Sequence, residues 1–140
     1  MTERAWETAR LDELESIGGW IPLRRNFDIR AFGINAWTGE VGSEPIGEHD
    51  EEDSGHEELY VVVRGRATFT VGGDEIDAPA GTVVFVSDPA LRRKGVVAEP
   101  DTLILTVGAT PGQAYEPLGW EVNATVIPLF GTGEYAEAKR

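Results

Sequence analysis

Short apolar runs separated by turn signals make up most of the chain from Trp20 onward. Several runs alternate apolar and polar residues, which is the two-residue period of a half-buried strand. Many short strands with regular turns are typical of a β-sandwich or barrel. We expect strands at Ile29–Trp37, Glu58–Arg64, Arg66–Val71, Thr82–Val86 and Leu103–Val107, with weaker ones at Ser43–Gly47, Asp74–Asp77, Gly95–Val97 and Asn123–Ile127.

Glycine pairs and the two ends of the chain refine this picture. Gly72-Gly73 lies between two alternating segments and favours a two-residue hairpin, because both turn positions need a positive φ. Apolar residues between Thr8 and Ile17 have helical spacing, and residues 134–139 are a helix-forming string. We therefore predict an N-terminal helical segment at residues 1–19, a barrel at residues 20–128 and a C-terminal helical stub at residues 129–140.

Composition narrows the possible partners and the compartment. Asp and Glu outnumber Lys and Arg by 25 to 12, a formal charge of −13, so the surface repels nucleic acid and anionic membranes. The chain has no cysteine, which excludes disulfides and thiolate chemistry. The N-terminal residues lack an apolar signal region, and no apolar run has the ~20 residues of a membrane helix. We expect a cytoplasmic protein.

Both histidines of the chain lie beside a dense run of acids at residues 48–53. His56, Glu58, Tyr60 and Val62 alternate along one predicted strand, so their side chains share one face. An imidazole and a carboxylate would then project side by side into whatever that face encloses. This combination indicates a metal or ligand site, or the remains of one.

The segment from His56 to Gly81 resembles the first half of a cupin barrel. Glu58 and Gly65 keep the Glu-x6-Gly spacing of that superfamily, and Pro79-Ala80-Gly81 keeps its Pro-x-Gly motif. The residues from Glu58 to Gly65 are also similar to the cupin consensus for that strand. The resemblance covers roughly residues 40 to 110. It implies an all-β fold, a small antiparallel jelly-roll-like barrel with the site inside, and a homodimer.

The family's metal ligands are only partly present. Its paired histidines would fall near Glu52–Ser54, which are acidic or small, and its last histidine near Pro89–Lys94, where Arg92 and Arg93 stand instead. The family's three-histidine, one-glutamate site therefore cannot be assembled from His49 and His56.

Three interpretations stay open at this stage. His49, His56 and Glu58 could hold Fe(II), Mn, Ni or Zn with open positions for substrate. Alternatively, Glu58 could pair with Arg92 or Arg93 in a metal-free pocket that binds a polar small molecule. In the third interpretation His56 is an ordinary packed strand residue and the acidic run is a solvated loop.

Further residues could line the pocket. Asn35 and Trp37 share one strand face, and the Tyr60 hydroxyl could orient a ligand, so we predict Glu58, Tyr60, Arg93, Asn35 and Trp37 as ligand-binding residues.

We expect a small-molecule-binding barrel with a degenerate or absent metal site. The alternative is a metal-dependent oxygenase or isomerase that uses two histidines and Glu58. Gly133 to Ala138 also resembles the opening of a tetratricopeptide-repeat helix, which implies a barrel that leads into helical repeats in relatives or in a longer parent chain. The alternative is an ordinary C-terminal helix.

Overall fold

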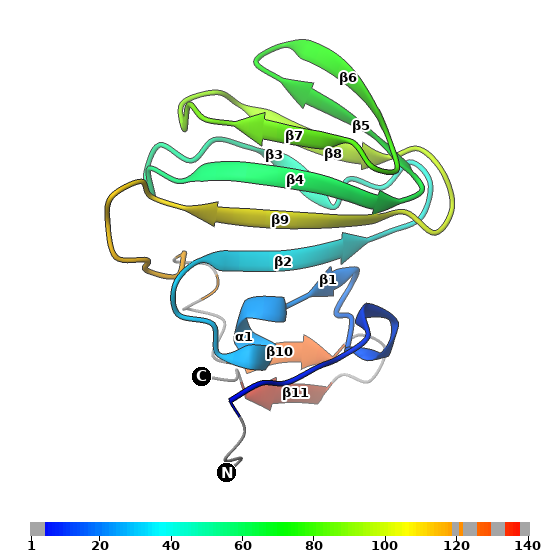
Figure 1. The fold of residues 1–140 in the computed structure, drawn as a ribbon. Helices are drawn as coiled ribbons and strands as arrows, with labels where there is room; N and C mark the ends of the chain where they lie inside the picture. The colour runs from blue at the N-terminus through cyan, green and yellow to red at the C-terminus, as the bar shows by residue number, and fades with distance from the viewer. Residues whose placement is uncertain (1–4, 119–120, 122–125, 130–133, 138–140) are drawn as a thin grey trace.

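Two antiparallel sheets pack face to face and enclose the main core (Figure 1). In the computed structural model of the chain, the described residues are 5–118, 121, 126–129 and 134–137. One sheet has the strand order β1-β2-β9-β4-β7, the other has β3-β8-β5-β6, and β10 pairs with β11. The bounds are β1 Trp20–Ile21, β2 Gly33–Thr38, β3 Ile46–His49, β4 Glu57–Arg64, β5 Arg66–Val71, β6 Asp74–Pro79, β7 Val83–Val86, β8 Arg93–Val97, β9 Leu103–Ala109, β10 Val126–Leu129 and β11 Glu134–Glu137.

Buried and more exposed side chains alternate along the strands, which confirms the two-residue period that the sequence predicts. In β4 the side chains of Glu58, Tyr60 and Val62 are buried, whereas those between them are half-buried or exposed. Tyr60 and Val62 belong to one core cluster with Phe69 of β5 and Ile46 of β3, and this cluster joins the two sheets. The prediction of an all-β antiparallel barrel of jelly-roll type is confirmed.

A second apolar cluster covers part of the outer face of the five-stranded sheet. Ile21, Leu23, Ala36 and Leu103 form it, and Leu11 and Leu14 from the N-terminal segment pack against it. Leu23 belongs to α1 (Leu23–Phe27), a short helix that ends at Asp28 in the left-handed conformation. This helix was not predicted, since five residues are too few for a periodic signal.

The predicted helix from Thr8 to Ile17 is wrong. Only Leu11–Glu13 form a helix, a single 3-10 turn (η1), because Leu11 and Leu14 are held by the sheet face rather than by a regular helix. Gly18-Gly19 does not end a helix but makes a tight turn, in which Ile17 and Trp20 exchange two backbone hydrogen bonds. The predicted strand Ile29–Trp37 begins only at Gly33, after α1 and its left-handed Asp28.

The predicted C-terminal helix is also wrong where the structure describes it. Glu134–Glu137 form strand β11, which pairs with β10 from Val126↔Glu137 to Leu129↔Glu134. A helix of about two turns is marginal alone, whereas strand pairing gives every second residue a backbone partner. Residues 123–125 of the expected strand Asn123–Ile127, and Gly133 and Ala138 of the repeat-like segment, lie outside the described residues. Within the described part of the chain, no helix has the length and apolar character to cross a membrane.

Three glycines with a positive φ are required for different structural reasons. Gly72 and Gly73 form the predicted two-residue hairpin between β5 and β6, with φ values of 57° and 90°. Gly65 has a φ of 78° and also lies against Thr102, so that an added Cβ would be 2.5 Å from Thr102 Cα. The glycine of the Glu-x6-Gly spacing is therefore required by close backbone approach as well as by conformation.

We predict that Gly65→Ala destabilises the protein much more than Gly73→Ala. Both glycines have a left-handed φ, but nothing lies within 4 Å of a Cβ placed at Gly73. Gly73→Ala should cost about 1–2 kcal/mol of backbone strain, and Gly65→Ala about 1–3 kcal/mol more from overpacking. Urea denaturation of both variants measures the difference, and equal losses would refute the close-approach explanation.

Candidate functional site

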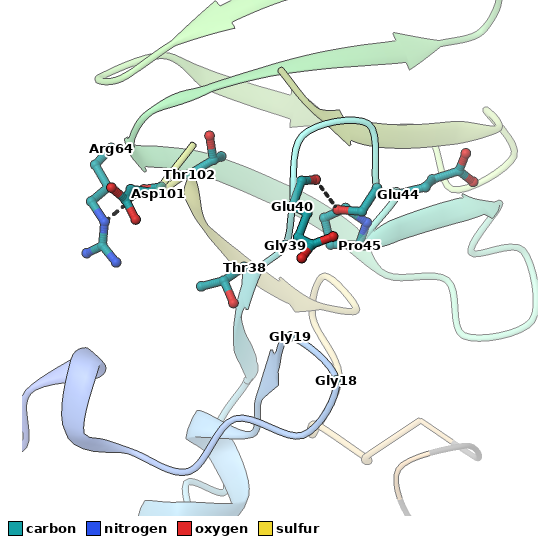
Figure 2. Close-up of a pocket in the computed structure, with 11 residues that line it drawn as sticks. Gly18, Gly19, Thr38, Gly39, Glu40, Glu44, Pro45, Arg64, Asp101 and Thr102 are labelled. Atoms are coloured by element: carbon teal, nitrogen blue, oxygen red, sulfur yellow. Dashed lines mark hydrogen bonds between the residues drawn. The ribbon is translucent and has the colours of Figure 1, made fainter. Parts of the chain in front are cut away.

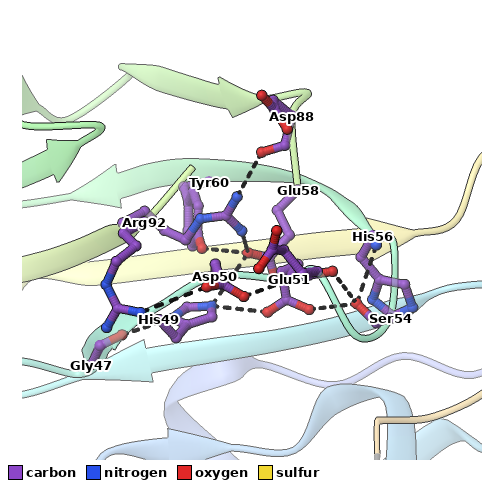
Figure 3. Close-up of polar contacts among 12 residues, drawn as sticks. Gly47, His49, Asp50, Glu51, Ser54, His56, Glu58, Tyr60, Asp88 and Arg92 are labelled. Carbon is purple, nitrogen blue, oxygen red and sulfur yellow. Dashed lines mark hydrogen bonds and ion pairs between the residues drawn. The ribbon is translucent and has the colours of Figure 1, made fainter. Parts of the chain in front are cut away.

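Glu58 is the centre of a buried polar cluster between the two sheets (Figure 3). Its Oε1 accepts a hydrogen bond from the Tyr60 hydroxyl at 2.5 Å and one from Arg93 Nη1 at 2.8 Å. Glu58 and Tyr60 come from β4, whereas Arg93 comes from β8 in the opposite sheet. The ion pair therefore connects the sheets through the barrel interior.

Arg93 is a fully buried cation, with 0% of its surface exposed. Besides Glu58, its guanidinium donates to the Asp88 carbonyl at 3.2 Å. Arginine does not deprotonate in proteins, so burial is tolerated only with a counter-ion and further acceptors. Arg92, the other candidate, is exposed and pairs with Glu48 and Asp50 at the rim, at 3.0 and 3.6 Å. The structure thus assigns the interior ion pair to Arg93.

His49 ends β3 and adds a second cation to the cluster. Its Nε2 lies 2.9 Å from Glu51 Oε2 and 3.6 Å from Glu58 Oε1, and its Nδ1 lies 2.7 Å from the Gly47 carbonyl. Hydrogen bonds to Glu51 and then to Glu58 raise the pKa of His49 to about 10. Both ring nitrogens therefore act as donors at neutral pH, and His49 is an imidazolium.

The environment also fixes the protonation of the neighbouring acids. Burial by itself would raise the pKa of Glu51, but hydrogen bonds from His49 and Ser54 outweigh it and hold that pKa below its usual value. Burial, followed by the adjacent Glu58 carboxylate, raises the pKa of Tyr60. Tyr60 consequently stays protonated and serves as a hydrogen-bond donor.

His49, Glu51, Glu58 and Tyr60 line an interior cavity of about 570 Å³, whereas Arg93, which was predicted to bind ligand, lies behind Glu58 and outside this lining. Asn35 and Trp37 from β2, Tyr60 from β4 and Thr106 from β9 line it, together with His49 and the acids around it. Asn35 accepts a hydrogen bond from Trp20 Nε1 at 2.7 Å, and the Trp20 and Trp37 rings stack with centroids 6.5 Å apart. The interior cavity therefore combines an aromatic wall with a charged end.

Comparison with solved structures identifies this architecture. A cupin protein from Bacteroides fragilis superposes with a TM-score of 0.61 at 15% identity, covering 82% of this chain and 92% of that one. This chain has the cupin fold. A predicted oxalate decarboxylase from Thermotoga maritima gives a TM-score of 0.56 at 20% identity, with 73% and 97% of the two chains covered. A cupin-superfamily sugar phosphate isomerase from Silicibacter pomeroyi gives 0.58 at 18% identity, with 75% and 77% covered.

No protein-family model and no curated protein matches the chain. The structural neighbours include proteins named as enzymes and a conserved Streptococcus pyogenes protein of unknown function. At these identities the comparison establishes the cupin fold and no activity.

His56 lies apart from the other predicted metal ligands in this cupin barrel. Its side chain is buried, and its ring packs at a tilt on Tyr115, with centroids 5.6 Å apart. Among the described residues, the potential ligand atoms within 4.8 Å of one another belong to His49, Glu51 and Glu58. The structure therefore puts Glu51 where the sequence suggested His56.

Sequence reasoning missed Glu51 and Thr106 for different reasons. Glu51 is one acid in a run at residues 48–53, and strand parity does not apply in a loop. Thr106 pairs with Asn35 in the β2–β9 register. The alternation of side chains along the predicted strand Leu103–Val107 could have placed Thr106 on the inner face, if the partner strand had been known.

The donor set fits a resident divalent metal only in part. One imidazole and two carboxylates, from His49, Glu51 and Glu58, suit several divalent ions. However, Glu58 Oε1 already binds Tyr60 and Arg93, and His49 carries a proton that a metal would have to displace. The permanent charge of Arg93 further opposes a second cation beside Glu58.

A larger hollow of about 680 Å³ lies at the other end of β4 (Figure 2). Its charged lining residues are exposed, and Arg64 there donates to the Asp101 carbonyl at 2.9 Å. Six residues separate Arg64 from Glu58, roughly 20 Å along a strand. The buried ionisable groups Glu51 and Glu58 line the smaller cavity, which makes that cavity the candidate functional site.

We predict that His49 stabilises the protein most at low pH. Its folded pKa is about 10 against 6.5 ordinarily, so its contribution is complete below about pH 6.5 and is lost as pH rises toward 10. The free energy of unfolding of wild type minus that of His49→Gln, from urea denaturation, should therefore shrink across this range. NMR of the histidine ring signals, with His56→Gln for assignment, checks the titration directly. A His49 signal that titrates near 6.5 would contradict the imidazolium assignment.

Proposed function

We propose that this cupin barrel binds a small polar molecule in its interior cavity without a resident metal. The observation that carries the proposal is the buried Arg93 guanidinium on Glu58. The Arg93 guanidinium supplies, inside the barrel, the positive charge that a metal would otherwise supply beside the Glu58 carboxylate. The residues that line the cavity would bind and orient a ligand. Tyr60 and His49 would act as hydrogen-bond donors, because their raised pKa values keep both side chains protonated.

Charge balance at the deep end of the cavity supports this proposal. His49 and Arg93 are positive, and Glu51 and Glu58 are negative, so the four groups sum to zero without any metal. A divalent ion would leave a positive excess even after His49 loses its proton. Desolvated charges of unequal number are costly in an interior, so the balanced state is favoured.

The second candidate is the metal-dependent enzyme, and the cluster of His49, Glu51 and Glu58 is the observation that favours it. Neighbours of the same fold are named as a predicted oxalate decarboxylase and a sugar phosphate isomerase, which are both enzymes that act on small molecules. In that case the three side chains would hold the metal, and the metal would act as a Lewis acid toward the substrate.

Metal content separates the two candidates. We predict that protein purified without a histidine tag, incubated with Fe(II), Mn(II), Ni(II) or Zn(II) and dialysed, retains far less than one metal per chain by elemental analysis. Arg93→Met removes the opposing charge and should raise metal affinity by more than about tenfold, whereas Arg92→Met at the exposed rim should change it little. One metal per wild-type chain that survives dialysis, is lost in Glu51→Gln and is kept in His56→Gln would establish the metal site instead.

We also propose that the chain forms a homodimer through the outer face of β4 and β7. The N-terminal segment and α1 cover the part of the sheet around β1, β2 and β9, whereas β7 ends the strand order. Three apolar side chains are exposed on the uncovered part: Val63 (43%), Val83 (59%) and Phe85 (57%). An apolar edge strand without charges invites pairing with a second strand, and in a protein of charge −13 an uncharged patch is where two copies repel least.

We predict that Phe85→Glu converts the dimer to a monomer. Light scattering after size-exclusion chromatography measures the mass of wild type and variant. Leu91→Glu is the matched control, because Leu91 is similarly apolar and exposed (40%) but lies in the loop before β8. A monomeric wild type, or a dimer that survives Phe85→Glu and is lost in Leu91→Glu, would refute this interface.

A further inference from the structure

Among the residues that the structure describes, five carboxylates and one basic side chain line the interior cavity. The acids are Glu48, Asp50, Glu51, Asp53 and Glu58, and the base is His49. Arg92 and Arg93 contact these acids from outside the lining. Even with His49 protonated, five negative groups therefore face three positive ones.

The excess negative charge lies toward the rim of the cavity rather than its deep end. Glu51 and Glu58 are balanced by His49 and Arg93, whereas Glu48 and Asp50 share the single guanidinium of Arg92. None of the ion pairs within the described residues includes Asp53, and this residue is exposed. A ligand that enters thus passes unneutralised carboxylates, on a protein whose net charge is already −13.

Beside these charged groups and the polar Asn35, Ser54 and Thr106, the lining has an aromatic and apolar part. Trp37 contributes its indole, and Pro45, Ile46 and Leu118 contribute hydrocarbon surface. An indole face is the strongest aromatic partner for an organic cation, and apolar surface of this kind binds the carbon skeleton of a ligand. The cavity therefore offers carboxylates to a positive charge and a hydrophobic wall to carbon.

We infer that the ligand of this cavity is a small organic cation, an ammonium group attached to a hydrocarbon or aromatic portion. The inference rests on the proposed binding function and narrows its ligand class. The ammonium group lies among the rim carboxylates with Asp53 as an unneutralised partner, and the carbon portion lies against Trp37. A carboxylate or phosphate ligand of the same size meets the rim acids as like charges and is excluded.

Two series of probes with matched shape and different charge test the inference. The first is choline, 3,3-dimethylbutan-1-ol and 3,3-dimethylbutanoate, which are positive, neutral and negative. The second is butylammonium, butan-1-ol and butyrate, which covers primary amines. Isothermal titration calorimetry of the full chain at low salt, with tryptophan fluorescence as a second readout, gives the affinities.

In at least one series the cation should bind more than about tenfold tighter than its neutral counterpart, and the anion should bind weakest. Added salt should weaken only the cation, because screening acts on the charged contact. Asp53→Asn and Trp37→Leu should each lower cation affinity severalfold. Glu75→Gln, which removes one exposed carboxylate from β6, should leave it unchanged.

The outcomes distinguish this inference from the proposed function. Neutral or anionic probes that bind as well as the cations, with binding lost in Trp37→Leu, would overturn the ligand class and leave a small-molecule site. If cation affinity falls equally in Glu75→Gln and Asp53→Asn, the net charge of the protein explains the binding. That result would refute a specific role of the rim carboxylates. Absence of binding by all six probes, or binding unaffected by Trp37→Leu, would overturn both.

Discussion

The ion pair between Glu58 and Arg93 is the contact on which the interior of this barrel depends. It connects β4 of one sheet with β8 of the other, and both side chains are buried. Removing one partner of such a pair leaves an uncompensated charge at a cost of about 3–5 kcal/mol. Tyr60, His49 and Asp88 each contact this pair, so their orientation follows from it.

The same pair sets the balance of charge inside the barrel. A guanidinium beside the glutamate supplies a permanent positive charge that needs no bound ion, and an imidazolium at His49 balances the second buried acid, Glu51. The deep end of the cavity is therefore neutral and pre-organised, whereas the rim is acidic. Under the ligand class inferred above, such a site would select ligands by charge at its entrance and by shape against Trp37.

Much of the fold could be predicted, because strands with one buried face carry their period in the sequence. Glu58, Tyr60 and Val62 alternate with outward residues, and Gly65 is required by its close approach to Thr102. The two terminal helices failed for the opposite reason. Leu11 and Leu14 have a spacing compatible with a helix, but they pack on a sheet face that local sequence does not reveal. Residues 134–137 pair with β10, and pairing overrides a weak helix propensity.

For the site, the sequence by itself determined the strand face that carries Glu58 and Tyr60, the presence of an arginine where the family has a histidine, and the shortage of histidines for the family's metal centre. Only the tertiary structure decided between Arg92 and Arg93, brought Glu51 to His49 and turned His56 toward Tyr115. The physical reason is that alternation fixes which side of its own strand a side chain occupies. Which groups then meet across the barrel depends on the register of strands distant in the chain and on the path of an acidic loop, and neither has a local pattern.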